Sequence, residues 1–350
     1  MIQAGTPTHR SMDEILKSRV TLLDIAADAG VSRATVSLVI RDVPSVAEST
    51  RKRVQRSIKR LGYIYHRGAA SLRMRQSHAI GLIVSDITNP FFAEVIVAIE
   101  ERLATARLVT LLGNTSEDRA KEERLLKTMR EFPADGILIC PALGHGDPTG
   151  FPNFASQLPT VSFGRRAAGL DYAGVDNAEG ALLAVEHLFQ LGNRRIAFVG
   201  GDPDFSTGRE RIDGYRMALA RLGLEFDSRL VFPAPPTRRG GYDSVPKFLR
   251  LENRPTAAFC FNDVVALGMI EALQHSGIRV GKEFGVVGFN NVPDAAQSLP
   301  GLTTIDTSPR ELGETAAELL LKRIQQPESP TRTVILQPRL IVRQSCGAGA

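Results

Sequence analysis

Residues 21–40 constrain the fold of this chain more than any other stretch. They read TLLDIAADAGVSRATVSLVI, two short amphipathic segments separated by a glycine. Apolar residues recur at helical spacing in both segments, so we predict two helices joined by a tight turn at Gly30. Helices this short bury too little apolar surface to fold alone. The pattern therefore predicts a helix-turn-helix that presents its second helix to DNA, with an ordinary helical hairpin as the alternative.

Hydroxyl residues mark the start of each predicted helix. Thr21 precedes the first helix with Asp24 three residues later, which is the spacing of a reciprocal capping pair, and Ser32 precedes the second. Gly30 stands where the chain must reverse, and glycine adopts left-handed backbone angles at low cost. With the apolar residues turned inward, the outward positions of the second helix are Arg33, Ala34, Ser37 and Leu38.

The positive charge of the chain is confined to its first quarter. Between residues 51 and 75 there are nine Lys or Arg residues and no acid. Residues 1–78 carry a net charge of +8 and the remaining residues one of −3, against a formal total of +5. A local excess of this kind is typical of a phosphate-binding module rather than of a protein that is basic throughout.

A third helix is predicted within the basic stretch. Three apolar residues in it have the spacing of one core face: Val54, Ile58 and Leu61. Ser45 and Glu48 are expected to cap its start and Gly62 to end it. A membrane-binding helix would need more large apolar residues opposite the charges. The stretch therefore favours nucleic acid over a membrane surface.

These segments resemble the headpiece of the LacI/GalR (lactose-repressor/galactose-repressor) family of bacterial transcription regulators. The match covers residues 21–40, then Val46, Thr50-Arg51, Arg53-Val54 and Leu61-Gly62-Tyr63, and it continues through nearly all of the remaining chain. The resemblance implies a hinge helix in which a leucine wedges into the minor groove of the operator. The DNA-binding residues that it implies are Thr21, Ser32, Arg33, Ala34, Thr35, Ser37, Leu38, Arg51, Arg53 and Tyr63, with Ala69 and Leu72 in the hinge.

From about residue 79 the pattern changes to alternating strands and helices. Ala79–Val84 is a continuous apolar run, typical of a strand buried on both faces. Further strands are expected at 108–112, 136–140, 195–199, 257–261 and 285–289, and helices at 91–106, 121–131, 180–191, 208–222 and 264–276. The alternation predicts an α/β fold with parallel sheets, and about 270 residues exceed what one open sheet usually holds.

The resemblance accounts for this length with a periplasmic-binding-protein-like core of two lobes, each built on a parallel Rossmann-like sheet. It implies chain crossings between the lobes near residues 177, 306 and 331. We therefore expect a disordered leader at 1–19, a helix-turn-helix headpiece at 20–64, a hinge at 65–78, a core at 79–345 and a frayed tail at 346–350. The N-lobe would comprise about 79–177 and 307–331, and the C-lobe about 178–306 and 332–345.

Polar residues cluster where ligands of open parallel sheets bind, beyond the carboxyl ends of the strands. The resemblance implies that an effector cleft is lined by Asp86, Asn89, Phe91, Asp176, Phe205, Thr207, Arg211, Asn262, Asp263 and Asn290. Carboxylates, amides, one guanidinium and an aromatic ring suit a polyhydroxylated or heteroaromatic small molecule, and we favour a sugar-like effector over a nucleobase. Helix capping is the alternative role for Thr207, Asn262 and Asp263.

Asn290 departs from the pattern of the family, because relatives commonly have an acid at this position. An amide keeps one hydrogen-bond acceptor, loses the charge and adds a donor. Specificity for a purine or a galactoside therefore cannot simply be carried over to this chain.

Common catalytic motifs are absent from the sequence. It contains no GxxxxGK[ST] loop, no GxGxxG after a strand, no HExxH and no GxSxG. Cys140, Cys260 and Cys346 lie far apart, so we expect buried thiols rather than a disulfide or metal site, and we expect no metal and no cofactor. We therefore predict no enzyme activity. A solute-binding or nucleotide-dependent enzyme core fused to a DNA-binding head is the alternative.

The sequence thus predicts a ligand-responsive repressor that binds a palindromic DNA operator as a homodimer, with a tetramer left open. The first 20 residues contain no apolar signal-peptide region, and no run approaches the 18 apolar residues of a membrane span. We therefore expect a cytoplasmic protein with no membrane partner.

Overall fold

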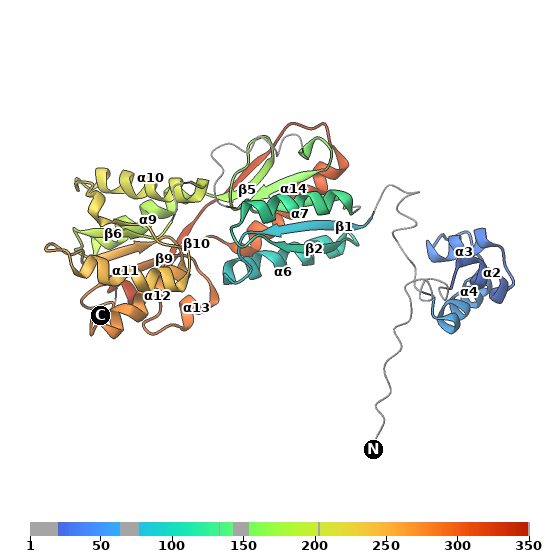
Figure 1. Ribbon diagram of the computed structural model, residues 1–350, viewed down its shortest axis with the longest axis horizontal. Helices are drawn as coiled ribbons and strands as arrows, with labels where there is room; N and C mark the ends of the chain where they lie inside the picture. Colours follow the sequence, from blue (N-terminus) through green and yellow to red (C-terminus); the bar gives the residue numbers. More distant parts are fainter. Residues whose placement is uncertain (1–19, 64–76, 133, 143–153, 202–203, 349–350) are drawn as a thin grey trace, which may run out of the picture. The chain divides into compact units, whose positions relative to one another are not determined.

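The structure is a computed structural model that describes residues 20–63, 77–132, 134–142, 154–201 and 204–348 (Figure 1). The chain divides into two units, Met1–Arg75 and Gln76–Ala350, each of which is described by itself. Among the described residues, no helix has both the length and the apolar character needed to cross a membrane.

Within its described residues, 20–63, the first unit has three helices: α2 (Leu22–Ala29), α3 (Arg33–Ile40) and α4 (Glu48–Leu61). The predicted capping box is confirmed, since the Thr21 backbone N–H donates to the Asp24 carboxylate at 2.7 Å and the Asp24 N–H donates to the Thr21 hydroxyl at 3.4 Å. Gly30 ends α2 with a left-handed φ of 60°, and Ser32 caps α3. Ile25, Val36 and other small or β-branched apolar residues meet Val54 of α4 in one core.

The predicted start of α4 is wrong in one detail. Its N-cap is Ala47, which has no side chain able to accept a hydrogen bond, and Ser45 does not cap the helix. Asp28 of α2 provides a different anchor for α4. It accepts hydrogen bonds from Ser57 and Arg60 at 2.5 Å each, and the hydrogen bond from Arg60 is the main reason that the pKa of Asp28 lies below its usual value.

The described residues of the second unit form two six-stranded sheets, which confirms the expected two-lobed α/β core (Figure 1). The N-lobe sheet has the order β11-β5-β4-β3-β1-β2, and all of its strands are parallel. The elements of this lobe are β1 (Ala79–Val84), α6 (Pro90–Thr105), β2 (Val109–Asn114), α7 (Arg119–Glu131), β3 (Gly136–Ile139), β4 (Thr160–Phe163), β5 (Asp171–Val175), α14 (Pro309–Gln325) and β11 (Thr333–Leu336).

The C-lobe sheet has the order β12-β10-β9-β8-β6-β7, with only β12 antiparallel to its neighbour. Helices α9 and α10 pack together in this lobe, as do α11 and α12. Its elements are α9 (Asn177–Gln190), β6 (Ile196–Val199), α10 (Ser206–Arg221), η1 (Ser228–Leu230), β7 (Val231–Phe232), α11 (Arg238–Leu249), β8 (Ala257–Cys260), α12 (Asp263–His275), β9 (Gly285–Asn290), α13 (Pro293–Gln297), β10 (Thr303–Asp306), β12 (Arg339–Ile341) and η2 (Gln344–Cys346).

The chain passes between the two sheets after β5, after β10 and between β11 and β12. The third crossing therefore lies after residue 336, later in the chain than the expected position near residue 331. Residues 333–336 still belong to the N-lobe sheet, because they pair in parallel with β5 from Thr333 against Tyr172 to Leu336 against Val175.

The expected frayed tail also begins too early. Cys346 is only 3% exposed and ends η2, where its thiol lies 3.1 Å from the Thr303 hydroxyl. The Ser345 hydroxyl donates to the Val286 carbonyl at 2.6 Å and accepts from the Thr303 N–H at 2.8 Å. These contacts tie the segment to β9 and β10. The expectation of buried thiols is confirmed for all three cysteines.

Candidate functional site

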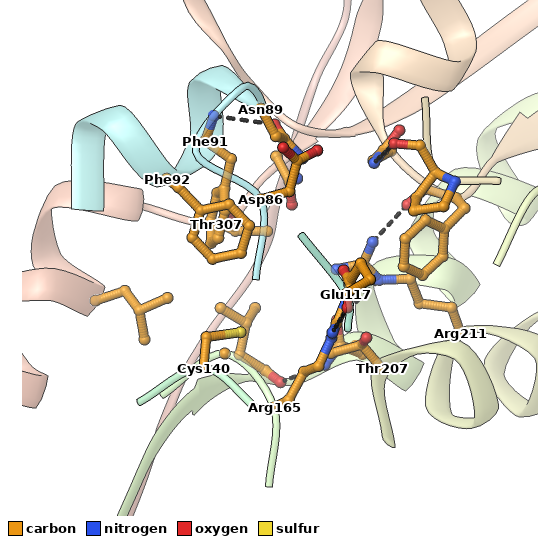
Figure 2. Close-up of a pocket in the computed structure, with 18 residues that line it drawn as sticks. Asp86, Asn89, Phe91, Phe92, Glu117, Cys140, Arg165, Thr207, Arg211 and Thr307 are labelled. Carbon is orange, nitrogen blue, oxygen red and sulfur yellow. Dashed lines mark hydrogen bonds and ion pairs between the residues drawn. The ribbon is translucent and has the colours of Figure 1, made fainter. Parts of the chain in front are cut away.

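A pocket opens within the second unit where the carboxyl ends of the strands of both sheets meet. It contains about 630 Å³ of free space, its open mouth included. The N-lobe wall carries Asp86, Asn89 and Phe91, which follow β1, and the C-lobe wall carries Thr207 and Arg211 of α10 (Figure 2). This is the position that open parallel sheets reserve for ligands, because successive strands end there in loops that contribute polar side chains.

Most of the residues predicted for the effector cleft line this pocket: Asp86, Asn89, Phe91, Thr207, Arg211, Asn262 and Asn290. Capping and lining are not exclusive roles. The Asn89 side chain accepts the Phe91 N–H at 3.1 Å at the start of α6, and the Asn262 side chain accepts the Val265 N–H at 2.8 Å at the start of α12. Each amide group is thereby fixed in orientation beside the pocket.

Three predicted residues do not line the pocket, and each has a structural role instead. Asp176 caps α9 by accepting the Glu179 N–H at 3.0 Å. Phe205 is buried beneath the Arg165 guanidinium, whose carbon lies 4.4 Å from the ring centre.

Asp263 is the third of these residues and is fully buried. Its carboxylate accepts hydrogen bonds from the Thr304 hydroxyl at 2.5 Å and from the Val292 N–H at 2.8 Å. Burial raises the pKa of Asp263 to about 6. Its place at the start of a helix suggested a ligand-binding acid, but the Asp263 carboxylate instead joins α12 to β10.

Arg211 is the most unusual residue of the pocket. It is 6% exposed, its Nε donates to the Asn177 side chain at 2.9 Å, and its Nη1 donates to the Phe261 carbonyl. The guanidinium carbon lies 3.7 Å from the centre of the Phe289 ring. Burial lowers the pKa of Arg211 to about 9. The side chain is thus held rigidly, although the partners named here are amide, carbonyl and ring rather than a carboxylate.

Sequence reasoning missed a second buried arginine. Arg165 forms a two-pronged ion pair with Glu117 at 2.7 and 2.8 Å and donates to the Pro141 carbonyl at 2.8 Å. Arg165 and Glu117 both line the pocket, together with Phe92, Cys140, Asn177, Pro236, Phe261 and Thr307, none of which was among the predicted site residues. The four-residue strand β4 is too short for its apolar pattern to predict a strand, so the sequence does not mark Arg165 as a polar residue at a strand end.

A chain of polar contacts joins Arg211 to a contact between the lobes. Asn177, which accepts from Arg211, donates to Glu210 at 2.7 Å. Glu210 of the C-lobe also pairs at 3.3 Å with Arg166, which follows the N-lobe strand β4. The Arg166 backbone N–H donates to the Ser206 hydroxyl at 3.1 Å. Hydrogen bonds and one ion pair thus connect the pocket to a contact between the lobes.

The headpiece residues predicted to contact DNA lie mostly on its surface. Arg33 and Ala34 occupy the first turn of α3 and are exposed, while Thr35, Ser37 and Leu38 are half-buried on the same helix. Thr21 and Ser32 are exposed caps, Arg53 is exposed on α4, and Tyr63 is half-buried. Ala69 and Leu72 lie outside the described residues.

Arg51 differs from the other predicted cations. Its guanidinium donates to the Asp42 carboxylate at 2.5 Å and to the Val43 carbonyl at 2.8 Å, and its side chain is only 13% exposed. It therefore fixes the turn between α3 and α4 within the headpiece.

Metal binding has no support in the described part of the chain, where no three His, Cys, Asp or Glu side chains are grouped to hold an ion.

The comparisons with known proteins agree with this arrangement. Residues 21–65 match the pattern described as "Bacterial regulatory proteins, lacI family", and residues 185–346 match a periplasmic binding protein-like domain. An HTH-type transcriptional repressor PurR of Photobacterium profundum is 33% identical over 93% of this chain and 98% of its own length.

Two solved structures are similar over the same span. The lac repressor dimer bound to operator and the anti-inducer ONPF has a TM-score of 0.85 at 26% identity, covering 94% of this chain and all of that one. The complex of the transcriptional regulator CelR with cellobiose has a TM-score of 0.70 at 29% identity, covering 93% of this chain and all of that one.

A helix-turn-helix headpiece and a two-lobed core with a pocket at the strand ends define a DNA-binding transcriptional repressor with an effector-binding core. The chain belongs to the LacI family of bacterial regulatory proteins. The relatives are repressors rather than enzymes, and this chain is not an enzyme.

Proposed function

We propose that this repressor binds a palindromic operator as a homodimer and that a sugar-like molecule in the pocket between its lobes controls that binding. The observation that carries the proposal is the pocket itself, since both lobes contribute polar side chains to it. A ligand that contacts both walls favours one arrangement of the lobes over another, and only such a differential affinity can shift a conformational equilibrium.

DNA recognition is assigned to α3 and to the cations around it. The outward position of Arg33 in the first turn of α3 suits a two-pronged contact with a guanine edge, and the Leu38 side chain suits contact with a thymine methyl group. Exposed cations of α4, such as Lys52, Arg53 and Arg56, are expected to contact phosphates and to make the affinity depend on salt. Ala69 and Leu72 remain predicted contacts of the hinge with the minor groove.

A dimer is supported by an apolar surface of the N-lobe. It comprises Val97 of α6 and Val109, Leu111 and Leu112 of β2, which are 39–54% exposed. Strand β2 is at the edge of its sheet, and an exposed apolar edge strand favours association with another chain. Two-fold symmetry would then place two headpieces on a palindrome. Sedimentation of wild type and Leu111→Glu tests this assignment: we expect the variant to be monomeric, and a monomeric wild type would contradict it.

A sugar-like effector is supported by the polar lining of both walls and by the aromatic rings of Phe91 and Phe261. The structural relative described with cellobiose has the same two-lobed fold. A nucleobase is the competing ligand class, because an aromatic ring also stacks on a base. Since a repressor acts on the bacterial chromosome, we expect the protein in the cytoplasm.

The test is a ligand screen combined with footprinting. Thermal unfolding of the full chain is measured with sugars, sugar acids and nucleobases, and each ligand that raises Tm is added to a footprinting assay on palindromic DNA. We expect protection of a palindrome that changes with the ligand. The proposal would be contradicted if the protein protects all DNA sequences equally, both without a ligand and with each ligand tested.

A further inference from the structure

The carboxylates around Arg211 are already engaged. Glu210 is bound by Asn177 and Arg166, and Asp263 by Thr304 and Val292. Among the described residues, no carboxylate lies within ion-pair distance of the Arg211 guanidinium. Burial lowers the pKa of Arg211, and the nearby charges of Glu210 and Asp263 offset this only in part.

The remaining charges of the pocket are divided between its two walls. Glu117 and Arg165 neutralise each other through their two-pronged ion pair. On the N-lobe wall the remaining charged side chain is Asp86, whose Oδ1 accepts hydrogen bonds from the N–H and the hydroxyl of Thr88. On the C-lobe wall it is Arg211, and Figure 2 shows these two side chains on opposite sides of the pocket.

Thr307 supplies a second, independent indication of the ligand. Thr307 lines the pocket and is 2% exposed, and its buried hydroxyl has no hydrogen-bond partner among the described residues. A buried hydroxyl without a partner is costly, and at the wall of a pocket a ligand atom can supply the missing partner. Since a hydroxyl both donates and accepts, it suits a ligand hydroxyl or a carboxylate oxygen.

Asn290 completes the C-lobe wall without adding charge. It is 6% exposed and lies next to Phe289, on whose ring the Arg211 guanidinium is stacked. An acid at this position would add a negative charge to the wall that carries Arg211. With an amide there, the positive charge is left for the ligand to neutralise.

We infer that the effector is a hydroxylated monocarboxylate of the sugar-acid class, whose carboxylate pairs with Arg211 while its hydroxyls reach Thr307 and Asp86. This inference rests on the proposed function and narrows its ligand class. A guanidinium without an ion-pair partner suits the single charge of a carboxylate, whereas a phosphate ester carries nearly two charges at neutral pH and would be repelled more strongly by Asp86. A neutral sugar or a nucleobase would leave Arg211 buried without a counter-ion.

The test compares acids with neutral sugars of the same stereochemistry on the full-length chain. Calorimetric titration is carried out with D-gluconate, D-glucuronate, D-galactonate and D-galacturonate, and with D-glucose, D-galactose, D-glucose 6-phosphate and hypoxanthine. We expect at least one acid to bind about tenfold or more tightly than its neutral counterpart, as a charge-assisted contact allows. The inference is overturned if no acid binds, or if a neutral sugar, the phosphate or the nucleobase binds as tightly as the best acid.

Two variants examine the assignment without removing Arg211 from its structural contacts. Asn290→Asp supplies an internal acid, so the acid ligand should lose at least about tenfold in affinity while a neutral sugar loses less or gains. Thr307→Val keeps the shape and removes the hydroxyl, so Tm should not fall while acid affinity drops several-fold. The control is Arg216→Gln, which removes an exposed guanidinium from the same helix as Arg211 and should leave acid affinity unchanged. Unchanged acid affinity in both Asn290→Asp and Thr307→Val would overturn the inference.

A further measurement on the same protein preparation distinguishes failure of this inference from failure of the proposed function. Operator affinity is measured without ligand and then with each compound that binds. A response to a neutral sugar or a nucleobase alone overturns the carboxylate assignment and leaves the repressor intact. Loss of any preference for a palindrome overturns the proposed function.

Discussion

The headpiece and the core build their candidate sites in different ways. In the headpiece, exposed side chains lie on a helix whose ends are fixed by near neighbours, such as Ser32 and Thr35, three residues apart. In the core, Arg211 is held by Asn177 and Phe261, which are 34 and 50 residues away in the sequence. The DNA-binding face therefore depends on local rules, and the pocket depends on long-range packing.

The largest effect is expected from adding one methyl group between α11 and α12. A Cβ at Gly268 would lie 1.9 Å from the Arg238 carbonyl oxygen, so Gly268→Ala must push the two helices apart. We expect a loss of about 3 kcal/mol or more in unfolding free energy, at the upper end of overpacking effects. Urea denaturation followed by circular dichroism measures it.

The matched control is the same substitution in the headpiece. Gly62 has a φ of +64° and nothing within 4 Å of an added Cβ, so Gly62→Ala should cost about 1 kcal/mol, from backbone conformation alone. Equal losses in the two variants would show that packing in the core is no tighter than in the headpiece.

Next in size is a pH effect from Asp263. Because its pKa is raised from 3.8 to about 6, the folded chain keeps a proton between these values that the unfolded chain has released. The contribution of Asp263 to stability is therefore complete below pH 4 and is lost as pH rises through 6, by about 2–3 kcal/mol in all. Asp263→Asn should gain that amount relative to wild type between pH 4 and pH 7, as measured by urea denaturation. If the difference in unfolding free energy between Asp263→Asn and wild type does not change with pH, the Asp263 carboxylate has the pKa of a group exposed to water.

In the headpiece, Arg33→Ala should relax base preference at one position of each half-site by about 1–3 kcal/mol. Fluorescence anisotropy on operators substituted one base pair at a time measures the change. Arg56→Ala serves as the comparison, because an exposed cation of α4 should weaken binding to all sequences alike and lower the salt dependence. Uniform weakening by Arg33→Ala would instead make Arg33 a phosphate contact.

The smallest effect is expected where the lobes meet. Arg166→Ala removes the partly exposed ion pair to Glu210, which is worth at most about 1 kcal/mol, so effector affinity should fall about two- to fivefold. Calorimetry measures this fall, with Arg216→Ala as an exposed arginine of α10 whose partner, Asp213, lies in the same helix. If Arg166→Ala and Arg216→Ala bind the effector with the same affinity, Arg166 does not connect the pocket to the contact between the lobes.

These differences explain which features of the fold and of the pocket could be predicted from the sequence. Caps, turns and the faces of α2 and α3 follow from residues three or four apart, and the long apolar runs predicted β1, β3, β6, β8 and β9. The short strands β4 and β5 lack such a signal, so Arg165 was missed. Asp263 and Phe205 occupy loop positions typical of ligands, and only the packing of β10 and of Arg165 against them shows that they are buried supports.

We propose that one metabolite, bound between the lobes, controls the affinity of the headpiece for DNA. Operator affinity with and without the effector, and effector affinity with and without the operator, can be measured on the same protein. We expect both affinities to change by the same factor, as reciprocal coupling requires. An effector that binds the pocket and leaves operator affinity unchanged would contradict it.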